Sequence, residues 1–98
     1  MSASDLTQFQ FQLLAILAER DDAPKGVTVK ESLEAHHDTE INHGRLYQNL
    51  DQLVEAGFVT KRPRDGRTNA YILTAEGRET LEAELAWFHR QLAAEVPA

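Results

Sequence analysis

The sequence contains no cysteine, and only three of its 98 residues are lysines. Without cysteine, the chain cannot form disulfides, thiolate zinc sites or thiol-based redox sensors. No apolar run approaches the ~20 residues needed to cross a bilayer, and the N-terminal residues lack the basic segment of a signal peptide. We therefore expect one soluble domain that stays in the cytoplasm and has no contact with a membrane.

The net charge of −6 argues at first against binding to nucleic acid, because the phosphate backbone repels acidic proteins. The charge is unevenly distributed, however. Residues 42–78 contain six basic and four acidic side chains, a balance of +2, so the rest of the chain carries −8. Seven arginines against three lysines, with acidic groups crowded outside this segment, resemble the composition of a halophilic surface.

Helical periodicity predicts three helices in the first part of the chain, at residues 6–20, 28–37 and 42–56. Asp5 or Thr7 can cap the first of these helices. This helix has apolar residues on two faces, more than a single-domain monomer is expected to cover.

The other two helices have clear boundary signals. Thr28 and Glu31 form a capping-box pattern that predicts the start of the second helix. Asn42 can cap the third helix, and Gly57 stands where a C-terminal glycine is expected.

An Asp65-Gly66 pair between two β-prone runs, residues 58–62 and 68–73, predicts a hairpin with its turn at 63–67. A last helix is expected from Ala75 to about Glu95. The fold class is therefore mainly α with a small β-hairpin, in the order α-α-α-β-β-α. This is the winged helix-turn-helix arrangement, with residues 1–74 as the DNA-binding unit and 75–98 as a C-terminal dimerisation helix of the same compact unit.

In that arrangement the third helix enters the major groove. The helical wheel places Gly44, Arg45, Gln48 and Gln52 opposite the apolar stripe of this helix. Arg and Gln side chains can hydrogen-bond to guanine and adenine edges, and a glycine allows close approach of the backbone. The alternative is that these side chains form an ordinary solvated face.

The hairpin carries four basic residues within seven positions, where phosphate or minor-groove contacts are expected. Solubility is the alternative explanation for these charges. The full set of residues expected to bind DNA is Thr28, Lys30, Asn42, His43, Gly44, Arg45, Tyr47, Gln48, Gln52, Arg62, Arg64 and Arg67, with Lys61 as the fourth basic residue of the hairpin.

Two segments carry a family resemblance. Residues 42–53, with Gly57, resemble the recognition helix of PadR-family regulators, which has a Gly-x-Leu-Tyr core, and residues 67–78 resemble that family's second wing strand and Tyr-x-Leu-Thr-x-x-Gly motif. The similarity spans residues 6–92, and the chain is particularly similar to the small PadR-like proteins of haloarchaea.

This resemblance implies a dimeric transcriptional regulator, usually a repressor, that binds a palindromic operator. It also implies that Tyr47 touches the DNA backbone, although a half-buried packing role fits equally well. Larger family members continue beyond one C-terminal helix, so whether a small-molecule effector acts on this chain stays open.

The last helix repeats apolar residues at coiled-coil spacing, which favours a seam between two subunits. The second apolar face of the first helix adds to the same expectation. The residues expected at the interface of a homodimer are Phe11, Leu14, Leu81, Leu85, Phe88 and Leu92.

No chemistry of catalysis is visible in the sequence. The serines lack a nucleophile-elbow context, and no glycine-rich phosphate loop is present. The sequence has four histidines, His36, His37, His43 and His89, and they do not have metal-ligand spacing. We therefore expect no enzyme, no metal and no cofactor.

Two alternatives to a sequence-specific regulator remain: a winged-helix module that binds protein, and a non-specific architectural DNA binder.

Overall fold

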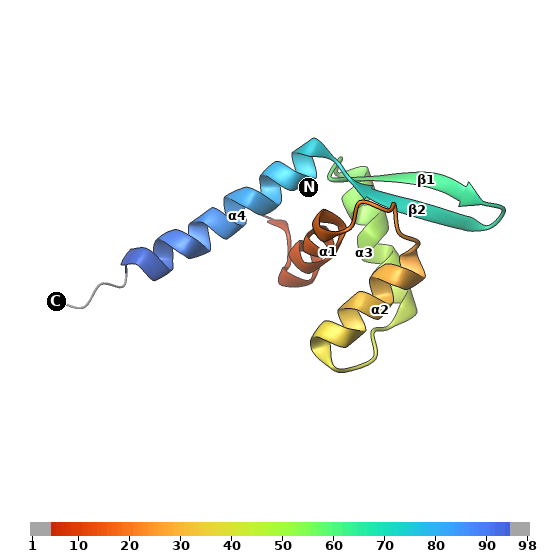
Figure 1. Ribbon diagram of the computed structural model, residues 1–98, viewed down its shortest axis with the longest axis horizontal. Helices are drawn as coiled ribbons and strands as arrows, with labels where there is room; N and C mark the ends of the chain where they lie inside the picture. Colours follow the sequence, from red (N-terminus) through yellow and green to blue (C-terminus); the bar gives the residue numbers. More distant parts are fainter. Residues whose placement is uncertain (1–4, 95–98) are drawn as a thin grey trace.

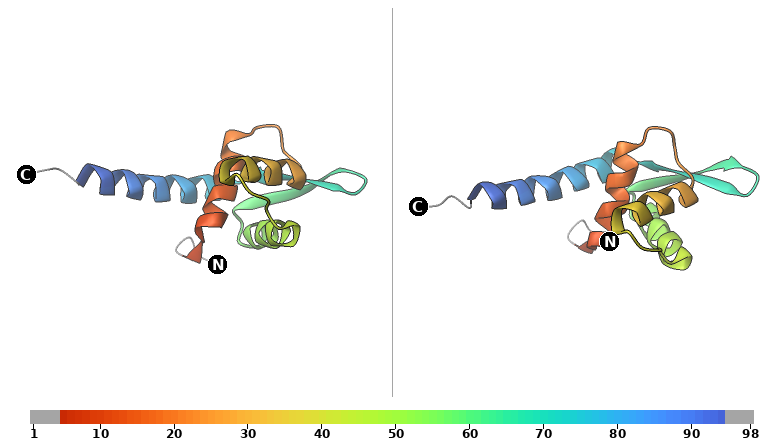
Figure 2. Two further views of the ribbon diagram at one scale, coloured as in Figure 1. Left: turned by 90° about the horizontal axis from the view of Figure 1, so that it is seen from below. Right: turned by 60° about the horizontal axis from the view of Figure 1, so that its bottom comes forward.

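The computed structural model describes residues 5–94, and its element order is the expected one. Helices α1–α3 form the body of the molecule, the β1–β2 hairpin projects from one side, and α4 extends in the opposite direction (Figures 1 and 2). Glu95, the expected end of the last helix, lies outside the described residues. The elements are α1 (Gln8–Glu19), α2 (Gly26–His37), α3 (His43–Glu55), β1 (Val59–Asp65), β2 (Thr68–Leu73) and α4 (Ala75–Ala94).

Thr7, rather than Asp5, caps α1. The Thr7 Oγ1 atom accepts a hydrogen bond of 3.1 Å from the Gln10 backbone N–H, and the Thr7 N–H donates one of 3.0 Å to Gln10 Oε1. This reciprocal capping box satisfies two N–H groups that the first helical turn would otherwise leave unpaired.

The predicted start of α2 at Thr28 is wrong, because the helix begins two residues earlier at Gly26. Lys25 is its N-cap and makes no side-chain capping bond. The chain enters the helix directly from an extended segment: the Tyr71 N–H donates to the Pro24 carbonyl at 3.0 Å, and Lys25 pairs with Ala70 of β2. This long-range pairing, rather than a local cap, determines where α2 starts.

Both predicted boundary signals of α3 are confirmed. Asn42 Oδ1 accepts a hydrogen bond of 2.8 Å from the Arg45 backbone N–H. After the helix, Gly57 adopts a φ of 87°, in the left-handed region that residues with a Cβ rarely enter. The chain turns there into β1.

The predicted five-residue turn at 63–67 is also wrong, because β1 continues through Pro63 to Asp65. Pro63 pairs with Asn69 and Asp65 pairs with Thr68, with a β-bulge between the two pairs. In the described part of the chain, β1 pairs only with β2 and is an edge strand. A proline is tolerated there because the N–H it lacks has no neighbouring strand to bind.

The hydrophobic core lies between α1, α2, α3 and the base of the hairpin, and Leu14 belongs to it with 0% exposure. The prediction that Leu14 forms part of a subunit interface is therefore wrong. A single chain covers both sides of α1, since this helix contacts α2, α3, α4 and β2. Phe11 stays partly exposed at the edge of the core.

Helix α4 packs against the core near its start through Leu81, and Glu84 and Phe88 border a hollow that Phe11 of α1 also lines. Further along, its large apolar side chains are open to solvent as α4 runs away from the body (Figure 1). None of the described helices is both long and apolar enough to span a membrane. The exposed side chains are Leu85 (52%), Trp87 (49%), Phe88 (51%) and Leu92 (69%).

Candidate nucleic-acid interface

An open groove of about 440 Å³ lies where α2, α3 and the hairpin meet. Residues 25–27 at the start of α2 line one side, and His43 and Tyr47 of α3 line the floor. Residues 67–69, from the hairpin tip and the start of β2, complete it. Three segments far apart in the sequence thus place two cations, Lys25 and Arg67, around the first turns of α3.

Tyr47 is half-buried, and its ring lies so close to Gly26 that a Cβ at that position would overlap the ring. The His43 ring stacks on it in a tilted arrangement, with 4.6 Å between centroids. The packing role considered for Tyr47 is therefore real. Its ring still borders the groove, so a contact to DNA stays compatible with this packing.

The four residues expected to read DNA do not share one face of α3. Gly44 and Gln48 are exposed, and Arg45 is exposed on the flank nearest α1. Gln52 is half-buried, and its Oε1 accepts a hydrogen bond of 2.9 Å from Gln10 Nε2 on α1. The prediction of Gln52 on the exposed face is wrong, because α1 covers that flank.

The basic residues of the hairpin are also divided between its two sides. Arg67 lines the groove, whereas Arg62 and Arg64 border a different hollow beside the α1–α2 loop. Lys61 forms an ion pair of 3.1 Å with Asp51 of α3. Of these four cations, Arg67 is the one beside the first turns of α3.

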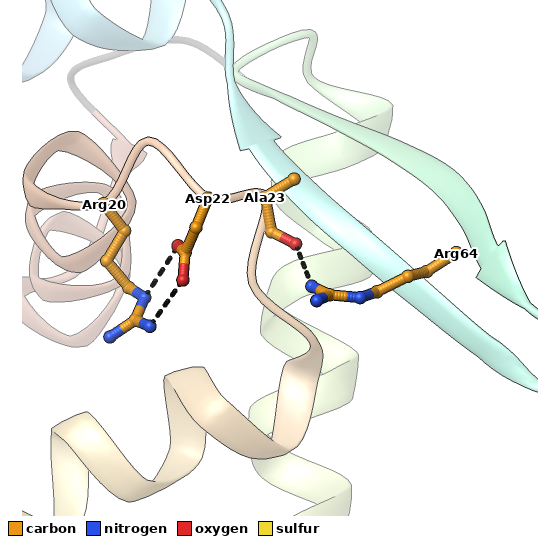
Figure 3. Close-up of polar contacts among 4 residues, drawn as sticks. All are labelled: Arg20, Asp22, Ala23 and Arg64. Atoms are coloured by element: carbon orange, nitrogen blue, oxygen red, sulfur yellow. Dashed lines mark hydrogen bonds and ion pairs between the residues drawn. The ribbon is translucent and has the colours of Figure 1, made fainter.

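Arg64 reaches from the hairpin to the α1–α2 loop, where its Nη1 donates a hydrogen bond of 2.6 Å to the Ala23 carbonyl (Figure 3). Ala23 has a φ of 50°, which is unusual for a residue with a Cβ. On the other side of the loop, the hydrogen-bonded Arg20 guanidinium lowers the pKa of the Asp22 carboxyl. The loop that carries Lys25 to the groove is thus tied both to α1 and to the hairpin.

The remaining predicted contacts have other partners. Asn42 uses its side chain to cap α3, and Lys30 lies 3.7 Å from Glu34 in an ion pair within α2. Thr28 is half-buried in the first turn of α2. Sequence reasoning missed Lys25 and Asn69, both of which line the groove. The helix-breaking turn just before Lys25 was a signal for the first of these.

Among residues 5–94, no group of three or more histidine, aspartate or glutamate side chains is placed to hold a metal ion. What the groove presents is hydrogen-bond donors, the first turns of α3 and two cations, Lys25 and Arg67. Such a surface suits a polyanion that has a groove of its own to receive the helix.

The family described as "Transcriptional regulator PadR-like family" matches residues 13–83. The structure of RosR from H. salinarum is 43% identical, with a TM-score of 0.89, covering 97% of this chain and 84% of that one. The complex structure of hsRosR-S1 has the same identity, a TM-score of 0.90, and coverage of 97% and 83%. The S. aureus MepR–DNA complex shares only the fold, at 18% identity and a TM-score of 0.74, with coverage of 96% and 68%. No curated protein sequence matches the chain.

The family match covers most of the chain and includes α3 and the hairpin. The expected fold class, the PadR resemblance and the absence of enzyme activity are confirmed by these similarities. The chain belongs to the PadR-like family of transcriptional regulators, and it is a DNA-binding regulator rather than an enzyme.

Proposed function

We propose that this protein acts as a homodimer, recognises a palindromic operator and represses transcription. The observation that carries the proposal is the groove beside α3, where Lys25 and Arg67 flank a helix whose outward residues are Gly44 and Gln48. This surface offers phosphate contacts next to an element that fits the major groove.

Each part of the surface has its own task in this proposal. Gln48 reads a base edge, adenine being the usual partner of a glutamine, and Gly44 lets the helix backbone approach closely. Arg45 reads a guanine from the flank of α3. Lys25 and Arg67 contact the sugar-phosphate backbone or the minor groove, and they account for the salt dependence of binding.

The homodimer is supported by α4. Its apolar side chains are about half or more exposed, although exposed residues of this size are usually scattered singly on a monomer. A second copy that packs α4 against α4, and against Phe11 of α1, covers them. Two-fold symmetry then places two copies of α3 about one DNA turn apart, ~34 Å, which requires an inverted repeat.

In this view residues 1–74 bind DNA and residues 75–98 bind the second subunit. The protein acts in the cytoplasm, on the DNA there. Repression is proposed because it is the usual activity in the family that the sequence resembles, and no effector is assigned.

The proposal is tested by selecting bound sequences from a random DNA library and titrating the enriched site by fluorescence anisotropy. An inverted repeat is expected. Gln48→Ala should lower affinity for that site by about 1–3 kcal/mol for each half-site and leave affinity for random DNA unchanged.

Glu55→Ala is the control, because it removes an exposed side chain of the same length from the last turn of α3, outside both the groove and the seam of α4. If no sequence is enriched, specific recognition is contradicted, and a protein-binding or architectural role takes its place. If Gln48→Ala binds as the parent does, α3 is not the element that reads bases.

A further inference from the structure

Three consecutive side chains in the first turn of α1 face two other helices, α3 and α4. Phe9 lies under Arg45 of α3, Gln10 hydrogen-bonds to α3, and Phe11 borders a hollow that Phe88 of α4 also lines. Phe9 and Gln10 are buried, with 7% and 3% exposure. A short segment with no side chain in the groove therefore bears directly on the orientation of α3.

The contact between Phe9 and Arg45 is a cation–π interaction. The Arg45 Cζ atom lies 3.9 Å from the centroid of the Phe9 ring, well within the range of this interaction. Arg20 and Lys61, by contrast, are paired with carboxylates, which occupy part of their N–H donors. A guanidinium that lies on a ring face keeps the N–H groups at its edge available for a base or a phosphate.

Gln10 fixes α1 against α3, so that the ring stays beneath Arg45. Its Nε2 donates to Asn49 Oδ1 at 3.1 Å and to Gln52 Oε1 at 2.9 Å. Asn49 Nδ2 in turn donates to the Arg45 carbonyl at 2.8 Å. A continuous chain of hydrogen bonds thus leads from the capped start of α1 to the backbone of Arg45.

We infer that Phe9 is a positioning residue for DNA recognition, which holds the Arg45 guanidinium in its binding orientation before DNA arrives. This inference rests on the proposed function, in which Arg45 contacts the operator. Ordering a long side chain in advance removes part of the entropy cost of binding. Phe9 thereby raises operator affinity through Arg45 without touching DNA.

The test is a double-mutant cycle on the full-length protein and the selected operator, with Phe9→Leu, Arg45→Ala and the combined variant. Loss of a cation–π contact corresponds to about a two- to fivefold loss for each half-site, and so roughly 4- to 25-fold for a dimer. We expect Phe9→Leu to lose this much affinity for the operator but not for random DNA. In the Arg45→Ala background the same change should have less than about a twofold effect. Phe9→Tyr, which keeps the ring face, should restore operator affinity.

Phe58→Leu is the matched control, because Phe58 is equally buried (5%) but lies beyond the far end of α3. It should lower the melting temperature without changing the ratio of operator to random affinity. The inference is overturned if Phe9→Leu keeps that ratio, or if its effect persists in the Arg45→Ala background. The inference is also overturned if Arg45→Ala leaves the operator affinity unchanged. If no operator can be selected at all, the proposed function itself is contradicted.

Discussion

Replacement of Phe88 by alanine should separate the two subunits while the protomer stays folded. Phe88 lies on α4, where 51% of the residue is exposed in a single chain. Its ring contributes little to the core of the protomer, so the variant should keep its helical content and melt cooperatively. The change should appear instead in the dimer dissociation constant.

The magnitude follows from the exposed area. A phenylalanine buries roughly 150–250 Å² in a protein, so a half-exposed one offers on the order of 100 Å² to a partner. At about 25 cal/mol per Å², this area corresponds to about 2.5 kcal/mol. A two-fold interface contains the residue twice, which makes about 5 kcal/mol, or a loss of roughly 10³- to 10⁴-fold in dimer affinity.

Sedimentation velocity over a range of protein concentrations measures this loss. The single tryptophan offers a second readout, because Trp87 is 49% exposed on α4. Its fluorescence in the parent should change with protein concentration as dimers form, whereas in Phe88→Ala it should not. Val27→Ala is the control, since Val27 is 48% exposed but belongs to α2. A Phe88→Ala protein that dimerises within about tenfold of the parent would refute a seam along α4.

Three further results are expected. Arg67→Ala should make the slope of log operator affinity against log salt shallower by about two units for the dimer, one for each Arg67. Arg64→Ala, which loses a bond to the α1–α2 loop, should leave that slope unchanged, and DNA titrations at several salt concentrations distinguish the two variants. Gly26→Ala should lower stability by about 1–3 kcal/mol in thermal melts, because the new methyl group displaces the Tyr47 ring, and an unchanged melt would contradict that packing. Burial raises the pKa of Tyr71 to about 12, above the value of about 10 for an unfolded chain. The protonated phenol therefore stabilises the fold fully below pH about 10, and the free energy of unfolding should fall as the pH rises from about 10 to about 12. Thermal melts of Tyr71→Phe should depend less on pH in this window.

The features that the sequence predicted well depend on local chemistry. Helix α3 could be bounded correctly because Asn42 caps it through its own side chain and Gly57 supplies the left-handed residue that ends it. The order of elements followed from the periodicity of the apolar residues, which neighbours in space do not alter.

The turn at 63–67 was predicted too long because of local pairing within the hairpin, but the other incorrect predictions concern contacts between distant segments. The start of α2 depends on the pairing of Lys25 with Ala70, and the place of Gln52 depends on Gln10, 42 residues away in the chain. Leu14 stood on the second apolar face of α1, which was expected to meet another subunit, yet the fold of a single chain covers this residue. A helical wheel shows which residues share a face, but it does not show which neighbour covers that face.

The edge strand β1 has a consequence for how copies of the chain can meet. An open strand edge offers unpaired N–H and carbonyl groups to other chains and is a common starting point for aggregation. Here the edge carries Lys61, Arg62 and Arg64, a proline that lacks a donor, and a bulge that interrupts the ladder. These features discourage extension of the sheet by a second hairpin. Crowded molecules are therefore kept from joining strand to strand into fibrils, and the hairpin stays free as a separate projection.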